Sequence, residues 1–235
     1  MLDVVCNPRY GDYKDFDTLK RGAVLDIIQD VAIRDSAMCG YDVKKLKDIS
    51  IAWLMQGIKI QFLDEVSTNC PLQVFTAVKN MSAAASERCT TISQDGKTVV
   101  RCVANWFTFN IQKGRVCKIP DEIRSAYQMH DFDDDFFVYE KPELIDGVEC
   151  SYKIKVANKD IDTNMHLNNQ KSAEMLLDAL PFEYKFGTMT VFYKKAAFLG
   201  DELDVCVKKM SDGYYVHLAN SENEICVVGR FTDVM

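Results

Sequence analysis

The sequence predicts an α+β protein in which an antiparallel sheet wraps around one long helix, and it predicts this arrangement twice. Three observations lead to this prediction. A segment near the start has the apolar spacing of an amphipathic helix, strand-like runs follow it, and the second half repeats that order. The length of 235 residues suits two small domains of roughly 100 residues each.

The first half begins with the helix, which we expect over residues 19–38, with Gly40 as its stop signal. Its apolar residues recur three or four positions apart, which places them on one buried face: Leu19, Ala23, Val24, Ile27, Ile28, Val31 and Ala32. Strands rich in β-branched and aromatic residues are expected next, over residues 51–55, 58–62, 72–78, 83–93 and 98–111. Asp95 and Gly96 predict a hairpin turn before the last strand.

The second half repeats this order with a shorter helix. We expect that helix over residues 173–180, where Ala173, Leu176, Leu177 and Leu180 share a face and Pro181 ends it. Strands are expected over residues 152–156, 189–193, 203–210, 214–220 and 225–232. Asp212 and Gly213 predict a second hairpin turn.

The boundary between the halves is expected in residues 115–147, where a proline and many charges break the strand pattern. This range would connect a unit of residues 1–114 to a unit of residues 148–235. It contains an acidic stretch that we interpret as a solvated loop rather than a metal site: Asp131, Asp133, Asp134 and Asp135. A local echo supports duplication, because DFDT at 15–18 and DIDT at 160–163 each precede a helix.

Composition excludes several classes of function. Hydrophobic residues make up 48% and charged residues 27%, which is ordinary for a globular protein. The net charge of −7 argues against a nucleic-acid-binding protein, which usually has a basic face. Short lysine clusters are interpreted as solvated surface that matters only to an acidic partner: Lys44, Lys45 and Lys47, and Lys194 and Lys195.

The nine cysteines are spaced widely and form no C-x-x-C pair, so the usual zinc arrangement is absent from the sequence. We expect them to be reduced thiols, and a reducing compartment makes the cytoplasm the expected location. The first residues lack the basic and apolar regions of a signal peptide. No apolar run approaches the roughly 20 residues that span a bilayer.

The segment with the most chemistry is DTNMHLNN at residues 162–169, just ahead of the second helix. A carboxylate there can act as base or nucleophile, a histidine can move protons near neutral pH, and an asparagine can orient them. Backbone N–H groups at a helix start can stabilise an oxyanion. Asp and Asn before a helix are also ordinary capping residues, and a lone histidine is often structural, so the spacing alone leaves both interpretations open.

This run resembles the catalytic loop of the plant and bacterial acyl-ACP thioesterases, which reads D-x-N-x-H-V-N-N. Residues 115–124, RVCKIPDEIR, resemble the R-x-x-K-I-P-D-E-[VI]-R segment between the two halves of that family. Residues 52–54, AWL, resemble its W-V-[VL] strand, and Tyr193 followed by Gly200 and Asp201 is a further match. The resemblance covers nearly the whole chain.

The resemblance implies a tandem hot-dog fold, in which the N-terminal unit holds an acyl chain and the C-terminal unit supplies catalysis. The thioester would arrive on the phosphopantetheine arm of acyl carrier protein, and no metal or organic cofactor would be needed. The catalytic candidates carried over are Asp162 for water activation or nucleophilic attack, His166 for proton transfer or carbonyl binding, and Asn164 for orientation. Substrate-binding candidates are Asn168 and Asn169 beside the loop and, by analogy, the pocket residues Val24, Ile28, Trp53 and Met55. Ordinary core packing is the competing interpretation of these four.

The chain departs from the family pattern at three positions. The family strand continues Y-x-x-E after the tyrosine matched by Tyr193, and that catalytic glutamate is Ala196 here. Ser172 stands where a tyrosine is usual, and Gly57 where an arginine often occurs. The first departure bears on the rate and on activity itself, and Glu174 on the second helix is a candidate replacement.

Three functions therefore remain open. The expected function is hydrolysis of acyl-ACP to release a free fatty acid in fatty acid biosynthesis. The same machinery would cleave an acyl-CoA, because the reacting bond is identical. A non-catalytic acyl-binding protein is the alternative that Ala196 suggests. A monomer and a homodimer both fit two units in one chain.

Overall fold

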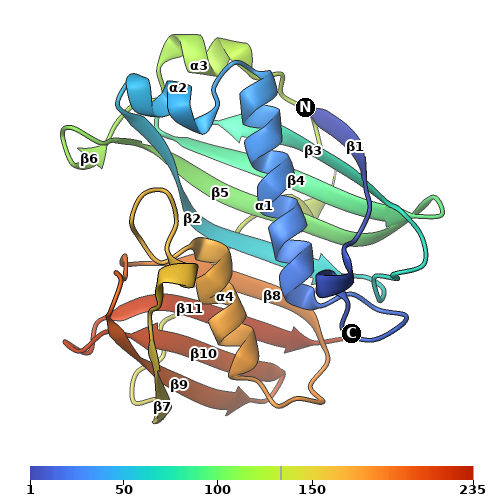
Figure 1. The fold of residues 1–235 in the computed structure, drawn as a ribbon, viewed down its shortest axis with the longest axis vertical. Coiled ribbons are helices and arrows are strands. Elements are labelled where there is room, and N and C mark those ends of the chain that lie inside the picture. Colours follow the sequence, from blue (N-terminus) through green and yellow to red (C-terminus); the bar gives the residue numbers. More distant parts are fainter. Residues whose placement is uncertain (133, 235) are drawn as a thin grey trace. The chain divides into compact units, whose positions relative to one another are not determined.

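The computed structural model describes every residue except Asp133 and Met235. The chain forms two compact units, Met1–Tyr139 and Glu140–Met235. Each unit is an antiparallel sheet with a helix against one face, as predicted (Figure 1).

The first unit contains five main strands in the order β1-β3-β4-β5-β2, with the short β6 beside β5. The strands are β1 Leu2–Cys6, β2 Ile51–Phe62, β3 Leu72–Met81, β4 Ala85–Gln94, β5 Lys97–Asn110 and β6 Arg115–Val116. The two runs expected on either side of Gly57 are one strand, β2, with a bulge between Met55 and Gly57. The predicted hairpin joins β4 to β5, where Asp95 and Gly96 both have positive φ.

Helix α1, Arg21–Met38, crosses the first sheet and follows the short helical turn η1, Tyr10–Asp12. Its apolar face is buried as expected, with Val24, Ile28 and Val31 at most 3% exposed. Burying each such side chain contributes roughly 1.5–3 kcal/mol. Gly40 ends this region with φ +83°, a conformation that glycine adopts without strain. Of the helices in the described part of the chain, none is long and apolar enough to cross a membrane.

A buried ion pair joins α1 to the first sheet. Asp35 on α1 is 1% exposed and Arg88 on β4 is 7% exposed. The Arg88 Nη1 lies 2.7 Å from the Asp35 Oδ2 and also donates to the hydroxyl of Thr76 on β3 at 3.4 Å. The other oxygen of Asp35, Oδ1, lies 3.0 Å from the amino group of Met1, so two cations stabilise this buried carboxylate.

Residues 115–139 pack on the first unit, and the division between the units after Tyr139 lies inside the range 115–147 that we expect to connect the two halves. Helix α3, Asp121–Ala126, buries Ile123 in a cluster with Ile119 and Tyr127, and helix α2, Val43–Asp48, adds Leu46 to it. The sequence pattern missed α3 because only one of its six residues is buried, among charged neighbours.

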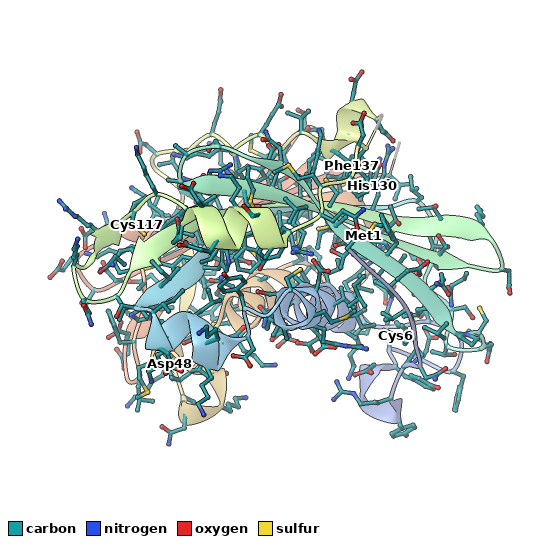
Figure 2. All side chains as sticks on the ribbon, turned by 90° about the horizontal axis from the view of Figure 1, so that it is seen from above. Met1, Cys6, Asp48, Cys117, His130 and Phe137 are labelled. Atoms are coloured by element: carbon teal, nitrogen blue, oxygen red, sulfur yellow. A yellow bond between two sulfur atoms is a disulfide. The ribbon has the colours of Figure 1, made fainter. Side chains whose placement is uncertain are left out.

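The acidic stretch follows α3 and is exposed at Asp131, Asp134 and Asp135, while Asp133 lies outside the described residues. Asp134 caps the helical turn η2, Asp135–Phe137, by accepting from the Phe136 N–H at 2.8 Å. Phe136 and Phe137 then pack with Cys89 and Val103 of the sheet. Figure 2 shows His130 and Phe137 on the side of the sheet away from α1.

The second unit repeats the strand order of the first, β7-β9-β10-β11-β8. Its strands are β7 Cys150–Lys155, β8 Phe186–Tyr193, β9 Glu202–Met210, β10 Gly213–Ala219 and β11 Ile225–Asp233. In both units the main helix follows the first strand, and the second strand pairs with the last of the five main strands. This match confirms the predicted duplication of fold.

Helix α4, Asn169–Asp178, packs on β10 and β11 and follows the helical turn η3, Asn158–Asp160. Ala173 and Leu176 are fully buried on its inner face. A Cβ at Gly229 on β11 would come within 3.0 Å of the Leu176 Cδ1, so glycine permits this close approach. The helix begins four residues before the expected start, because capping rather than apolar periodicity sets its first turn.

The expectation that all cysteines are reduced thiols is wrong for two of them. Cys150 on β7 and Cys206 on β9 form a disulfide, and the other seven are free. The two residues are 56 positions apart and become neighbours only because the sheet pairs them directly. Spacing along the chain does not reveal such a pairing.

We predict that Arg88→Met lowers the free energy of unfolding of the first unit by about 3 kcal/mol, because the buried Asp35 carboxylate then keeps only the Met1 amino group as a charged partner. Urea denaturation followed by tryptophan fluorescence measures this, since both tryptophans lie in the first unit. The control is Arg34→Met, which removes an exposed ion pair with Asp30 at 3.7 Å and should cost about 1 kcal/mol or less. Equal losses in the two variants would contradict the role of the buried pair.

Candidate active site

The loop before α4 is a compact turn held by backbone hydrogen bonds. Ile161 and Leu167 form an isolated antiparallel bridge that closes it. Within it, the Asp162 N–H donates to the His166 carbonyl at 2.8 Å, and the Met165 N–H donates to the Asp162 carbonyl at 3.1 Å. Met165 occupies the left-handed region with φ +63°, which is uncommon for a non-glycine residue. Backbone strain is thus present in the loop that carries the candidate catalytic residues.

Asp162 has a structural role in this turn. Its Oδ1 accepts from the backbone N–H of Asn164 at 2.8 Å and of His166 at 3.2 Å. The Oδ2 atom takes part in neither bond. The carboxylate is half-buried, so one oxygen holds the loop while the group still reaches solvent. A carboxylate fixed in this way is oriented before substrate arrives.

The three catalytic candidates lie within one turn but do not form a linked set. Asn164 is exposed and His166 is half-buried. Among the residues that the structure describes, no hydrogen bond joins the side chains of Asp162, Asn164 and His166 to one another. Catalytic hydrogen bonds often tighten only when substrate is bound, so this geometry does not exclude a shared role.

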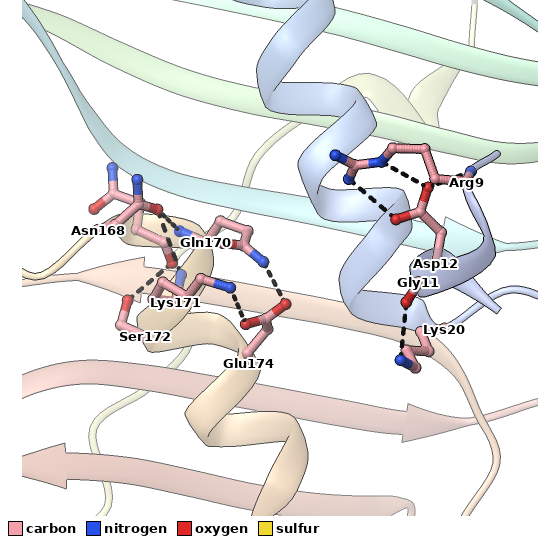
Figure 3. Close-up of polar contacts among 10 residues, drawn as sticks. Arg9, Gly11, Asp12, Lys20, Asn168, Gln170, Lys171, Ser172 and Glu174 are labelled. Carbon is pink, nitrogen blue, oxygen red and sulfur yellow. Dashed lines mark hydrogen bonds and ion pairs between the residues drawn. The ribbon is translucent and has the colours of Figure 1, made fainter. Parts of the chain in front are cut away.

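The two asparagines after the loop are parts of the helix start (Figure 3). The Asn168 Oδ1 caps α4 by accepting from the Gln170 N–H at 2.8 Å and the Lys171 N–H at 3.4 Å. These two N–H groups are therefore engaged by the cap, which limits the oxyanion site expected from the helix start. Asn169 is the first residue of the helix and is half-buried.

Two hydroxyl groups converge on the carbonyl of Asn169. The Ser172 Oγ donates to it at 2.9 Å, and the Tyr193 hydroxyl donates at 3.1 Å from the end of β8. Tyr193 thus ties β8 to the first turn of α4. Ser172, one of the departures from the family pattern, makes a bond within the helix and is 1% exposed.

The segment that follows β8 lies directly beside the loop. The Leu167 N–H donates to the Ala197 carbonyl at 2.8 Å. The ring of Phe198 packs edge-on against His166, with centroids 5.1 Å apart. Sequence reasoning missed Phe198, because an exposed aromatic residue in a loop gives no pattern.

Ala196 immediately precedes this contact and is exposed. The segment that carries it is therefore adjacent to the loop, as the match of Tyr193, Gly200 and Asp201 to the family pattern implies. The methyl group of Ala196 offers no hydrogen bond to water or substrate.

Glu174, the candidate replacement for the missing glutamate, is engaged within α4 (Figure 3). One of its oxygens accepts from the Gln170 side chain, and the other lies 2.7 Å from the Lys171 Nζ. Gln170 is 5% exposed, which anchors this group on the buried side of the helix. These contacts tie the carboxylate to its own helix.

The residues expected to line an acyl pocket all lie in the first unit. Val24 and Ile28 are on the buried face of α1, and Met55 on β2 is 7% exposed. Trp53 packs half-buried against the cluster that includes Ile123, and its Nε1 is a buried donor without a hydrogen bond among the described residues. This placement is compatible with core packing and with a pocket wall, so their role as a pocket remains a prediction.

The first unit contains a loop that is closed by a backbone bridge in the same way as the candidate catalytic loop. Tyr13 and Leu19 form an isolated bridge with the spacing of Ile161 and Leu167. In each unit the helix begins two residues after the second bridge position. Asp15 accepts from the N–H groups of Asp17 and Thr18, much as Asp162 does in the second unit.

Matching the two bridges shows which residues occupy equivalent places in the two loops. Asp162 corresponds to Lys14, and Asn164 corresponds to Phe16. The sequence match of DFDT at 15–18 with DIDT at 160–163 therefore differs by three residues from the equivalence that the two bridges define. The bridged loop is present in both units, but only the loop of the second unit has the candidate catalytic side chains.

Potential metal ligands do not gather at this loop. Among the described residues, the group of three or more such side chains is Cys150, Cys206 and His217, on strands β7, β9 and β10. The loop itself offers one carboxylate and one imidazole. A carboxylate and an imidazole are groups suited to acid–base or nucleophilic chemistry.

Comparison with known proteins agrees with this arrangement. The sequence pattern of the acyl-ACP thioesterase N-terminal domain matches residues 9–127, and that of the acyl-ACP thioesterase C-terminal domain matches residues 146–229. No curated protein sequence gives a significant match.

Solved structures with the same fold cover almost the whole chain. An acyl-ACP thioesterase from Bacteroides thetaiotaomicron has a TM-score of 0.84 and 18% identity, over 98% of this chain and 96% of that chain. The 12:0-ACP thioesterase from Umbellularia californica has a TM-score of 0.86 and 14% identity, over 98% and 96%. These similarities establish the tandem hot-dog fold, and the two sequence patterns, which span most of the chain, show that it belongs to the acyl-ACP thioesterase family.

Proposed function

We propose that this protein hydrolyses the thioester of a fatty acyl-ACP and releases the free fatty acid. The observation that supports this most directly is the loop of residues 162–167. It holds a half-buried carboxylate by its own backbone N–H groups, with an imidazole four residues on. Membership of the family supplies the substrate class.

In the proposed reaction, water or the Asp162 carboxylate attacks the acyl carbon. By the first route, Asp162 takes a proton from water as the water oxygen bonds to that carbon. By the second, Asp162 forms an anhydride that water then hydrolyses. In both, the carbon–sulfur bond breaks and the pantetheine sulfur leaves with a proton, for which His166 is the donor. Asn164 would orient these groups, and both routes remain open.

The substrate would be shared between two functional halves, proposed as residues 1–114 for the acyl chain and 148–235 for catalysis, with 115–147 between them. Val24, Ile28, Trp53 and Met55 would contact the acyl chain. Asn168 and Asn169 would contribute to substrate binding through the helix start that they build. The carrier would be acyl carrier protein, which presents the thioester on its phosphopantetheine arm.

Ala196 supports a second candidate function, a protein that binds acyl-ACP without hydrolysing it. The exposed methyl group lies next to the loop contact and offers no group to hold a water. Loss of one supporting group commonly lowers turnover by about 10²–10⁴ without abolishing it, so we favour slow hydrolysis. An acyl-CoA would be cleaved by the same chemistry, and competition between carriers separates the two substrates.

We propose that this activity takes place in the cytoplasm as part of fatty acid biosynthesis. The seven free cysteines are compatible with a reducing compartment. A monomer and a homodimer are both compatible with the proposed reaction.

Asp162→Asn tests the mechanism, because asparagine retains the oxygen that holds the turn and removes the charge. We expect kcat/KM for acyl-ACP to fall by at least about 10²-fold with an unchanged melting temperature. Asp15→Asn, the same change in the equivalent turn of the first unit, is the matched control and should leave turnover unchanged. Full activity in Asp162→Asn would rule out this mechanism.

Ala196→Glu tests whether the missing glutamate limits the rate. With a panel of acyl-ACPs of different chain length, we expect released acid and thiol to increase by about 10-fold or more over wild type. Ala196→Gln, which has similar size and no charge, should not show this gain. Hydrolysis in Ala196→Glu alone would mean that the natural protein binds acyl-ACP without turning it over. Equal rates in all three proteins would show that position 196 does not contribute.

The acidity of acyl carrier proteins leads to a prediction about the carrier. Lys194 is exposed just after β8, beside the segment that contacts the loop. We expect Lys194→Ala to raise KM for acyl-ACP by up to about fivefold at low salt, since an exposed charge pair contributes about 1 kcal/mol or less. The effect should diminish as salt is added. Lys113→Ala, an exposed lysine of the first unit, should leave KM unchanged. A KM for acyl-ACP that is insensitive to salt and to Lys194 would contradict docking near this segment.

A further inference from the structure

Three neighbouring strands of the second unit bring two cysteines and a histidine into one row. Cys150 on β7 is paired directly with Cys206 on β9, and Cys206 is paired directly with His217 on β10. Directly paired residues on adjacent strands project to the same face of a sheet. The donor atoms of the three side chains all lie within 4.8 Å of one another.

The histidine in this row has an unexplained buried polar atom. His217 is 6% exposed, and its Nδ1 has no hydrogen-bond partner among the described residues. Its ring packs edge-on against Tyr215, whose hydroxyl accepts from the Ile145 N–H at 3.3 Å. A buried imidazole nitrogen without a partner is uncommon in native proteins and calls for an explanation, such as a bound ion.

The character of the three donors indicates which ion would fit. Two thiolates and a neutral imidazole are typical ligands of zinc, at distances of about 2.3 Å for sulfur and about 2.0–2.1 Å for nitrogen. A tetrahedral ion at those distances requires sulfur atoms roughly 3.8 Å apart. The two sulfur atoms are bonded to each other here, and once that bond is broken they can separate to this spacing, with the His217 nitrogen already within 4.8 Å of both.

We propose that Cys150, Cys206 and His217 form a redox-controlled zinc site. In the disulfide state seen here the two sulfur atoms are bonded to each other and cannot both ligate a metal. A thiol reductant breaks the sulfur–sulfur bond by delivering two electrons and two protons, which gives two thiols. Zinc binding then releases both protons and leaves two thiolates on the ion.

Access to the site is one-sided. Cys206 and His217 are buried, whereas Cys150 is exposed on the edge strand β7. A reductant would reach the disulfide through Cys150. The same opening leaves the fourth position of a tetrahedral zinc ion to a water molecule.

The test is zinc binding to the whole protein before and after reduction. The fully reduced protein, freed of reductant without oxygen, is titrated with zinc alone, and bound metal is counted after gel filtration. We expect one equivalent in the reduced protein and none at this site in the oxidised protein. Cobalt in place of zinc should give a thiolate-to-metal charge-transfer absorption.

Variants assign the binding to this row. Cys150→Ser should weaken zinc binding by at least tenfold, and because Cys150 is exposed the fold should be preserved. Cys6→Ser, which changes a cysteine on the edge strand β1 of the first unit, should bind zinc as wild type does. His217→Asn should weaken binding and shift the cobalt spectrum, with circular dichroism as the check of folding. Reduced wild type that takes up no zinc, or zinc binding that is equal in Cys150→Ser, would overturn the proposal.

Discussion

The packing of an apolar helix face against an antiparallel sheet is the constraint on which each unit depends. α1 and α4 are the elements that cover the inner faces of their sheets, and each must begin at a defined residue for its buried positions to meet the strands. In the second unit Asn168 fixes that residue through its cap, and Gly229 permits the close approach of Leu176. The loop before the helix is consequently held at both ends, which positions any chemistry that it carries.

Structural roles and proposed catalytic roles fall on the same residues in the candidate site. Asp162 stabilises the turn with one oxygen, and the same carboxylate is the candidate base or nucleophile. Asn168 caps the helix by accepting hydrogen bonds from the backbone N–H groups of Gln170 and Lys171. Capping and the proposed catalysis are therefore compatible interpretations of this motif, because the cap fixes the position of the loop that carries the candidate residues.

Much of the fold could be predicted because strand alternation and helical periodicity are local signals. β5 and α1 follow directly from the spacing of their apolar residues. α3 and the packing of residues 115–139 could not be predicted, because a few buried residues among charged ones produce no regular spacing of apolar residues along the sequence. The Cys150–Cys206 pair and the contact of Phe198 with His166 depend on non-local pairing. The loop residues themselves were found through a motif, whereas their lack of mutual hydrogen bonds required the structure.

The hydrogen bond between Leu167 and Ala197 joins two backbone groups. This bond therefore does not use the side chain at position 196, in the segment that follows β8. Natural selection could exchange the residue at position 196 while leaving the turn, the helix start and the sheet intact. If the proposed function holds, one substitution at this position would separate hydrolysis of an acyl group from its binding without a change in architecture.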